Sequence, residues 1–415
     1  MRVKTSGGFR YTYNPIDNSI VDADSMVQSD LNIRFKPLGE IYKLPNISSF
    51  TIGVTERCNL RCSYCCYSGS YPEHRNHSTS SLSDDQIPSV LDFILKYINS
   101  NEISIDFYGG ESLLELDWIK KFIQKAKGIE TVVWNFEVST NGILLVPDIV
   151  DWLVANQFNV FVSVDGVGNF HDDCRKDING QPSYATIEKN LSYIKEHYPD
   201  FWTNNVHIMM TVRDISHLPE IAVSWDSSTL FEDKAPYRMS EVSTVYNDTT
   251  LKLDEDSELD KYLQLVDWYK GHPDNSLMGA FFNIWLAEWI NRPIGEIESN
   301  IEYPTCVPDN RKLYIDAKGN IGICERISDN IRFGTIADGI DFSKLNEVRR
   351  KTASFIDQSC SNCEMARVCD ICPDVLKIPE AMKETYCHNQ KVIQRVKFQC
   401  YCELAEADFI QNLWE

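Results

Sequence analysis

The sequence lacks the features that would place it in a membrane or on a nucleic acid. No run of about 18 uncharged apolar residues occurs, so no segment has the composition of a membrane-spanning helix. The segment that begins at Met1 has none of the apolar stretch of a secretory signal, and we expect a cytoplasmic location. Lys and Arg total 40 against 61 Asp and Glu, and the formal charge of -21 would repel a phosphate backbone. We therefore expect no membrane and no nucleic acid among its partners.

The acidic surplus itself leaves two interpretations open. It is typical of a solvated acidic surface, and it also suits attraction to a basic peptide. At 415 residues the chain exceeds the usual size of one domain, and its 43% of apolar residues can fill a sizeable core.

Cysteine is nearly absent from the middle of the chain, where Cys174 stands alone. The 14 Cys otherwise gather at both ends of this gap, four between Cys58 and Cys66 and nine between Cys306 and Cys402. In a large chain without an export signal, such groups are expected to bind metal rather than to form disulfides. The sequence therefore predicts two metal-rich regions.

The first group is a C-x-x-x-C-x-x-C loop made of Cys58, Cys62 and Cys65. Three thiolates hold three corners of a cubane iron-sulfur cluster, which normally takes four Cys, so one iron would be open to a small ligand. A structural zinc site is the alternative, but it needs a fourth ligand, and the adjacent Cys66 is poorly placed to reach the same ion. The spacing favours a cluster.

Short strand-like runs alternate with helical segments from residue 50 onward. This alternation predicts a parallel sheet with helical crossovers. About six such units fit in roughly 190 residues, fewer than the roughly 250 residues of a closed eight-unit barrel. We expect an α/β fold, a partial (β/α)6 TIM-like barrel followed by a Cys-rich α+β domain. The predicted strands cover residues 50–54, 103–108, 135–139, 160–164, 206–212 and 237–242, and the helices 84–100, 116–127, 147–156, 185–197 and 218–225.

The chain divides into four predicted parts. Residues 1–48 form an N-terminal extension with a hairpin around Asn14 to Asn18, and 49–243 form the barrel. Residues 244–300 form an aromatic helical bridge. Residues 301–415 form the Cys-rich domain, with a hairpin that turns at Lys318-Gly319-Asn320.

The loop Cys58-Asn-Leu-Arg-Cys62-Ser-Tyr64-Cys65 resembles the cluster loop of the radical S-adenosylmethionine (SAM) enzymes. In that family the amino and carboxylate groups of SAM occupy the open iron. The resemblance implies that Cys58, Cys62 and Cys65 are the catalytic cluster ligands and that the ring of Tyr64 lies beside the adenine.

The polar segments after the next predicted strands resemble the SAM-binding segments of the same family. Gly109 and Gly110 resemble its glycine turn, in which the backbone approaches the ligand closely, and Glu111 would meet the SAM ammonium. Ser139 and Asn141 lie in the segment that resembles the one meeting the ribose, and Ser163 in the segment after it.

Arg175, in His171-Asp-Asp-Cys-Arg175, would fork onto the SAM carboxylate. An ordinary surface charge is the alternative for this residue.

The C-terminal Cys set resembles the SPASM extension of radical SAM enzymes, which carries two auxiliary clusters. By position, Cys360, Cys363, Cys369 and Cys387 would hold the distal cluster, and Cys306, Cys324 and Cys372 the nearer one.

The sequence departs from the SPASM pattern at two places. The spacing from Cys369 to Cys372 has two residues where the family usually has three, and the position of a further ligand in some members is Asn300 here. With three thiolates, the nearer cluster would keep an iron open for a substrate thiolate. Cys400 and Cys402 are spare candidates for the fourth ligand, and a pair of structural zinc knuckles is the alternative for the whole region.

The resemblance implies a radical SAM peptide maturase with three 4Fe-4S clusters and SAM. Reductive cleavage of SAM would give a 5'-deoxyadenosyl radical, which abstracts hydrogen from a ribosomally made precursor peptide and so forms a thioether or carbon-carbon cross-link. A flavodoxin- or ferredoxin-type protein would supply the electron. The alternatives are a sulfatase-maturating oxidase that makes formylglycine and a non-catalytic iron-sulfur or zinc protein.

Overall fold

A computed structural model describes most of the chain. The described residues are 1–22, 31, 33–44, 46–69, 76–242, 251–295, 301–303, 305–306, 310–326, 331–377 and 379–410. Within these ranges, no helix is both long enough and apolar enough to cross a membrane.

Six parallel strands form the predicted partial barrel. Each strand pairs with the next one along the chain, in the sheet order β4-β5-β6-β7-β8-β9. The predicted α/β fold is therefore confirmed, with six strands at the expected places. The strands are β4 (Asn46–Thr55), β5 (Glu102–Gly109), β6 (Val133–Thr140), β7 (Asn159–Ser163), β8 (Val206–Val212) and β9 (Arg238–Glu241).

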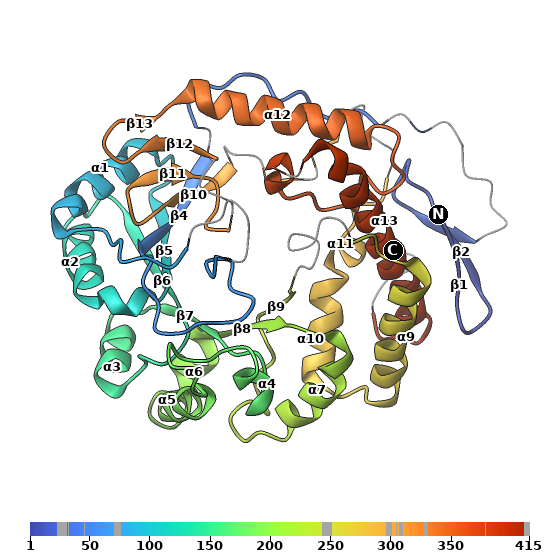
Figure 1. Cartoon of the computed structure of the whole chain (residues 1–415), viewed down its shortest axis with the longest axis horizontal. Helices are drawn as coiled ribbons and strands as arrows, with labels where there is room; N and C mark the ends of the chain where they lie inside the picture. Colours follow the sequence, from blue (N-terminus) through green and yellow to red (C-terminus); the bar gives the residue numbers. More distant parts are fainter. Residues whose placement is uncertain are drawn as a thin grey trace.

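Amphipathic helices cover the outer face of these strands, as Figure 1 shows for the helices left of and below the sheet. In α2 (Leu116–Lys127), the side chains of Trp118, Phe122 and Ile123 are buried at helical spacing. The Phe122 ring meets that of Phe107 from β5 edge-on, with 5.6 Å between centroids. These helices are α1 (Ile87–Tyr97), α2 (Leu116–Lys127), α3 (Pro147–Ala155), α5 (Tyr184–His197) and α7 (Leu218–Asp226).

Short helical pieces fill the remaining connections. They are η1 (Asp84–Gln86), η2 (Ser112–Glu115), α4 (Asn169–Asp172), α6 (Pro199–Asn205) and η3 (Ile215–His217).

The inner face of the barrel is polar and only partly buried along β5 and β6. Ile105 and Phe107 point to the helices and are fully buried, whereas the alternate residue Asp106 faces inward and is half-buried. A closed barrel fills this interior with layers of branched apolar side chains. The polar face instead presents hydrogen-bonding groups to the interior.

The N-terminal sheet has three antiparallel strands, β1 (Arg2–Lys4), β2 (Arg10–Tyr13) and β3 (Ile20–Asp22). The turn between β2 and β3 contains the Asn14 to Asn18 segment, and Asn18 has a positive φ of 63°. Asn tolerates this left-handed conformation better than most residues.

A second antiparallel hairpin continues the barrel sheet on its other side. Strand β10 (Asn310–Ile315) turns at Gly319 into β11 (Asn320–Gly322), as the sequence predicts. The sequence does not predict that β10 also pairs in parallel with β4, where Tyr314 lies opposite Thr51. The Cys-rich region therefore shares one ten-stranded sheet with the barrel, completed by β12 (Arg332–Thr335) and β13 (Gly339–Ile340).

Long helices close the side of the molecule opposite the barrel helices (Figure 1). Helices α9 (Glu255–Gly271), α10 (Ser276–Trp285) and α11 (Ala287–Ile290) lie in the predicted bridge. Helices α12 (Phe342–Cys360) and α13 (Glu380–Glu406) follow, joined through the short η4 (Pro373–Lys377). The N-terminal end of the chain lies beside α13 in Figure 1.

The junction of β4 and β10 predicts a specific steric clash. A Cβ atom on Gly53 would lie 2.5 Å from the Tyr314 hydroxyl oxygen. We expect Gly53→Ala to destabilise the protein by about 1–3 kcal/mol through overpacking, and Tyr314→Phe in the same chain to restore part of the loss. The thermal unfolding midpoint of the anaerobically purified holoenzyme measures both effects.

Gly271→Ala is the matched control, because no atom lies within 4 Å of its added Cβ. An unchanged midpoint in Gly53→Ala would mean that β10 does not pack against β4 in this way.

Candidate functional site

The first Cys loop lies directly after β4, at the carboxyl end of the barrel strands. Its backbone is held by the chain around Arg175. Arg61 N donates to Lys176 O at 2.7 Å, and Ser63 N donates to Cys174 O at 2.9 Å. These bonds fix the loop against the segment that follows β7.

Each of the three loop thiols has nitrogen donors near its sulfur. Leu60 N lies 3.4 Å from Cys58 Sγ, and Tyr67 N lies 3.4 Å from Cys65 Sγ. Arg175 lies 3.8 Å from Cys62 Sγ through its Nη1. N–H groups aimed at sulfur stabilise thiolate ligands of iron-sulfur clusters and tune their potential. The donor set therefore suits a cluster held by Cys58, Cys62 and Cys65.

The protein environment disfavours these thiolates when no metal is bound. Burial raises the pKa of Cys58 to about 12 and the pKa of Cys62 to about 11, and the neighbouring loop thiols add to both shifts. A hydrogen bond with Cys66, followed by burial, raises the pKa of Cys65. Metal binding must therefore displace protons from this loop, which couples it to pH.

A buried carboxylate joins two of the predicted SAM-binding residues. Asp165 accepts hydrogen bonds from the Tyr64 hydroxyl and, at 2.7 Å, from Arg175 Nε, and its other oxygen accepts from Thr211 N at 2.9 Å. Arg175 also lies 5.4 Å from the centre of the Tyr64 ring. Arg175 is buried at 8% exposure, so the surface-charge alternative is wrong.

Two residues that the sequence does not single out position Arg175 through its backbone. His171 Nδ1 accepts from Asp165 N at 3.3 Å, and His171 Nε2 lies 3.0 Å from the Ser183 hydroxyl. Ser183 in turn donates to Arg175 O at 2.6 Å. Burial lowers the pKa of His171 to about 4, so its ring is neutral and can accept at Nδ1.

The glycine turn after β5 approaches the Cys loop as closely as a backbone can. A Cβ on Gly109 would lie 2.2 Å from Thr55 O, and a Cβ on Gly110 would lie 2.1 Å from Arg57 O. Gly109 also has a φ of 142°. Only glycine fits both positions without a backbone shift.

Glu111 uses its carboxylate to hold the neighbouring turn. It accepts from Thr140 Oγ1 and Asn141 N, both at 2.7 Å, and from Leu113 N at 3.2 Å. Burial raises the pKa of Glu111, and these hydrogen bonds oppose that shift because they stabilise the carboxylate. Its side chain therefore positions the segment after β6, in addition to the SAM contact that the sequence suggests.

The other predicted SAM-binding side chains lie at the same edge of the sheet. Asn141 Nδ2 donates to Asn59 Oδ1 at 2.7 Å and lies 3.9 Å from Cys58 Sγ. Ser139 donates to Asp106 Oδ1 at 3.2 Å, and Ser163 is half-buried at the end of β7.

The four Cys predicted for the distal cluster lie near one another. Burial raises the pKa of Cys369, and Cys360, Cys363 and Cys387 raise it further through their charge. Burial raises the pKa of Cys360 to about 12, and Cys363 and Cys387 add to this shift.

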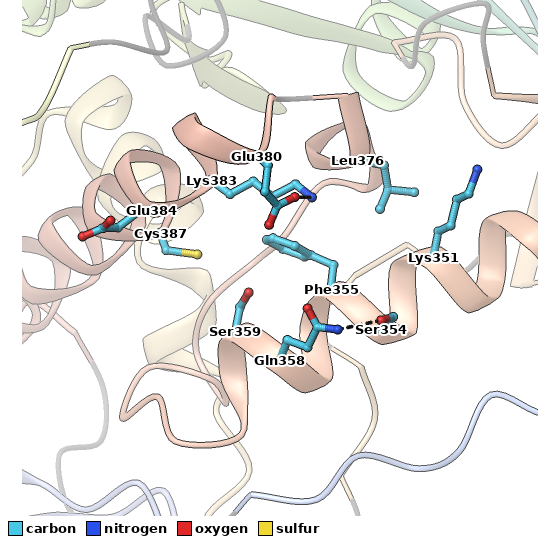
Figure 2. A pocket seen from close by; sticks show the side chains of 10 residues that line it. All are labelled: Lys351, Ser354, Phe355, Gln358, Ser359, Leu376, Glu380, Lys383, Glu384 and Cys387. Atoms are coloured by element: carbon cyan, nitrogen blue, oxygen red, sulfur yellow. Dashed lines mark hydrogen bonds and ion pairs between the residues drawn. The ribbon is translucent and has the colours of Figure 1, made fainter.

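An open cavity of about 520 Å³ is lined by one member of this set, Cys387. Figure 2 shows Cys387 on its wall, with Phe355 and Lys351 from α12 and Lys383 from α13.

The three Cys predicted for the nearer cluster come from segments that meet beside β10. Thr305 forms a parallel bridge with Ile371, so the next residues, Cys306 and Cys372, lie on adjacent segments. Burial raises the pKa of Cys324 to about 12 and also that of Cys306, and Lys312 opposes both shifts. Asn300, the position without a Cys, lies outside the described residues.

In the parts of the chain that the structure describes, no three His, Cys, Asp or Glu side chains are grouped as a single metal ion requires. Two observations support cluster binding by the Cys sets. N–H groups point at the sulfur atoms of the first loop, and neighbouring thiols in the sets raise the pKa of one another.

Of the four remaining Cys, two lie in α13 and two lie beside the first Cys loop. Cys400 and Cys402 are fully buried in α13, beside Glu403. Cys66 is hydrogen-bonded to the Cys65 thiol, and Cys174 is buried next to Cys62.

Residues 52–222 match the family described as the Radical SAM superfamily. The chain is 24% identical over 343 residues to the radical SAM cyclopropyl synthase TigE of Paramaledivibacter caminithermalis. The aligned region covers 78% of this chain and 67% of TigE. It is 23% identical over 350 residues to a cysteine-type anaerobic sulfatase-maturating enzyme of Clostridium perfringens, with 79% of this chain and 88% of that enzyme covered.

A solved structure, native anSMEcpe with bound AdoMet and Cp18Cys peptide, shares the fold. It matches with a TM-score of 0.64 at 19% identity, over 88% of this chain and 100% of that chain. The family match includes the Cys loop, the glycine turn and Arg175, which the fold brings to one edge of the barrel. Residues 52–222 are therefore a radical SAM domain, with the 4Fe-4S cluster and SAM that such a domain uses, and the chain is an enzyme.

Proposed function

We propose that this enzyme is a peptide maturase that links two positions of a precursor peptide through a thioether or carbon-carbon bond. The observation that carries the proposal is the second group of thiols, because it adds redox-active sites beside a radical SAM domain. The relatives also favour a peptide or protein substrate, since they are a cyclopropyl synthase and sulfatase-maturating enzymes, one of them with a peptide in its structure.

The radical SAM site would hold its ligands through residues at the carboxyl end of the strands. Cys58, Cys62 and Cys65 would bind three irons, and the bound cluster and SAM would supply a 5'-deoxyadenosyl radical that removes a hydrogen atom from the substrate. Tyr64 would lie against the adenine.

Asp165 accepts hydrogen bonds from both Tyr64 and Arg175. This one carboxylate would therefore position both the residue beside the adenine of SAM and the residue that binds the SAM carboxylate. Gly109 and Gly110 would let the backbone approach SAM closely, and the Glu111 carboxylate would meet the SAM ammonium. Ser139, Asn141 and Ser163 would offer polar groups to the ribose.

The C-terminal thiols would hold two further clusters, for a total of three. Cys360, Cys363, Cys369 and Cys387 would bind the distal cluster, and Cys306, Cys324 and Cys372 the nearer one. With three protein thiolates, the nearer cluster would keep one iron for a substrate thiolate. The cavity beside Cys387 is where we place electron exchange with a flavodoxin- or ferredoxin-type protein.

A second candidate is oxidation of a Cys or Ser to formylglycine in a sulfatase. The match to the Clostridium perfringens enzyme over 88% of its length favours this candidate as much as the match to TigE favours ring or cross-link formation.

The two candidates differ in their products. The anaerobically reduced holoenzyme is incubated with SAM and either a Cys-bearing precursor peptide encoded beside its gene or a sulfatase active-site peptide. We expect the precursor to lose two hydrogens and to give linked fragments in tandem mass spectrometry. An aldehyde captured by a hydrazide probe on the sulfatase peptide alone would establish the second candidate and dismiss the first.

Replacement of Cys58, Cys62 and Cys65 by Ala tests the assignment of clusters to Cys sets. We expect the triple variant to contain about four fewer irons per chain than the wild type, to retain its auxiliary clusters and to cleave no SAM. Iron analysis and electron paramagnetic resonance of the reduced protein measure this result. Replacement of Cys400 and Cys402 by Ser is the control and should leave the iron content unchanged.

Asp165→Asn tests the anion that holds Tyr64 and Arg175. The variant leaves the buried Arg175 without its counter-ion, so we expect SAM affinity to fall about tenfold or more, which is the loss expected for a charged hydrogen bond. Equilibrium dialysis with labelled SAM measures the affinity. Asp173→Asn, at an exposed position nearby, should bind as the wild type does. Unchanged SAM binding in Asp165→Asn would remove Asp165 from the SAM site.

A further inference from the structure

The inner wall of the barrel carries two carboxylates that the SAM and cluster sites do not use. Asp106 of β5 and Glu137 of β6 lie opposite each other in the parallel register, and both are half-buried. The Ser139 hydroxyl donates to Asp106 at 3.2 Å. Among the described residues, the Glu137 carboxylate has no hydrogen bond or ion pair.

The same row of the sheet contains a buried hydroxyl without a partner. Thr51 of β4 lies between Asp106 and Tyr314 in the register, and it is 1% exposed. Its Oγ1 makes no hydrogen bond within the part of the chain that the structure describes. An unsatisfied buried hydroxyl costs free energy, about 1–3 kcal/mol, which a donor on a ligand would recover.

Two cations, Lys312 and Arg326, lie near Glu325 in this region. Lys312 Nζ lies 2.9 Å from Glu325 Oε2, and although burial opposes it, Lys312 lowers the pKa of Glu325. Burial and then the charge of Glu325 raise the pKa of Asp106 to about 7; Lys312 opposes this shift and Glu137 adds to it. The three carboxylates of Asp106, Glu137 and Glu325 thus outnumber the two cations Lys312 and Arg326.

The row lies between the two Cys regions. Glu325 follows Cys324, and its backbone carbonyl accepts from the Tyr67 hydroxyl at 2.7 Å. Tyr67 N in turn donates to Cys65 Sγ. A group bound at Asp106 would thus lie beside the path that joins the radical SAM loop to the nearer auxiliary set.

We propose that Asp106 and Glu137 form a subsite in the barrel for a Lys or Arg side chain of the peptide substrate, close to the residue that is modified. This inference rests on the proposed peptide-maturase function and names a feature of its substrate. A lysine ammonium or arginine guanidinium would pair with both carboxylates. The acidic surplus of the whole chain, -21, would also draw a basic peptide toward the enzyme.

Peptide binding to the anaerobic holoenzyme with SAM tests the subsite. Two fluorescein-labelled pools of short randomised peptides are compared by fluorescence polarisation, one with Lys fixed at the centre and one with Gln. We expect the wild type to bind the Lys pool about tenfold more tightly, as a charge-assisted bond predicts. The double variant Asp106→Asn with Glu137→Gln should bind both pools equally.

Two further variants separate charge from folding. Asp106→Glu keeps the carboxylate and should retain a preference for the Lys pool, and its iron content reports intact folding. The double variant Asp85→Asn with Asp92→Asn removes an equal charge from exposed positions of η1 and α1 and should bind as the wild type does. Equal binding of the two pools by the wild type, or an undiminished preference in the double variant, would overturn the proposal.

SAM cleavage by the same wild-type preparation, measured without peptide, separates this inference from the proposed function. Cleavage without a preference for Lys would overturn the subsite alone. No cleavage would overturn the proposed radical chemistry, while a Lys preference that disappears in the double variant would still support the subsite.

Discussion

Strand β4 is paired in parallel on both edges, and the arrangement of every site depends on this pairing. On one side it binds β5, which ends in the glycine turn, and on the other it binds β10, whose hairpin leads to Cys324. Because parallel strands end at the same edge of a sheet, the Cys loop after β4 lies between these two neighbours. The barrel and the Cys-rich region therefore share one sheet and are not two separate domains joined by a linker.

The local features of this fold could be predicted because each carries its own signal in the sequence. The alternation around Phe50 and Ile105 marks strands, and the spacing of Trp118 and Phe122 marks a helix. The loops with Cys58, Gly109 and Asn141 followed these strands directly, so a parallel sheet had to bring them together.

The remaining features depend on contacts between residues far apart in the chain. Nothing around Lys312 or Tyr314 indicates that this strand pairs with β4, because a parallel pair has no turn to mark it. The support of Arg175 by His171 and Ser183 is also invisible, since either residue fits an ordinary helix or loop. The carboxylates of Asp106 and Glu137 could be placed on one face by alternation, but only the folded partial barrel identifies that face as the interior.

Helix α13 connects the Cys-rich region to the N-terminal sheet across the molecule. The distance along it from Cys387 to Glu403 is about 24 Å at 1.5 Å per residue. At its far end Glu403 accepts from both the backbone and the hydroxyl of Ser6, and Gln399 donates to Lys4 O. The N-terminal sheet, which contains no cysteine, is therefore anchored to a rod whose near end is a metal ligand candidate. If the proposed distal cluster forms at Cys387, loss of its iron would loosen α13 and with it the sheet held at the other end, so the proteolytic sensitivity of the first strands would report on metal content at a distance.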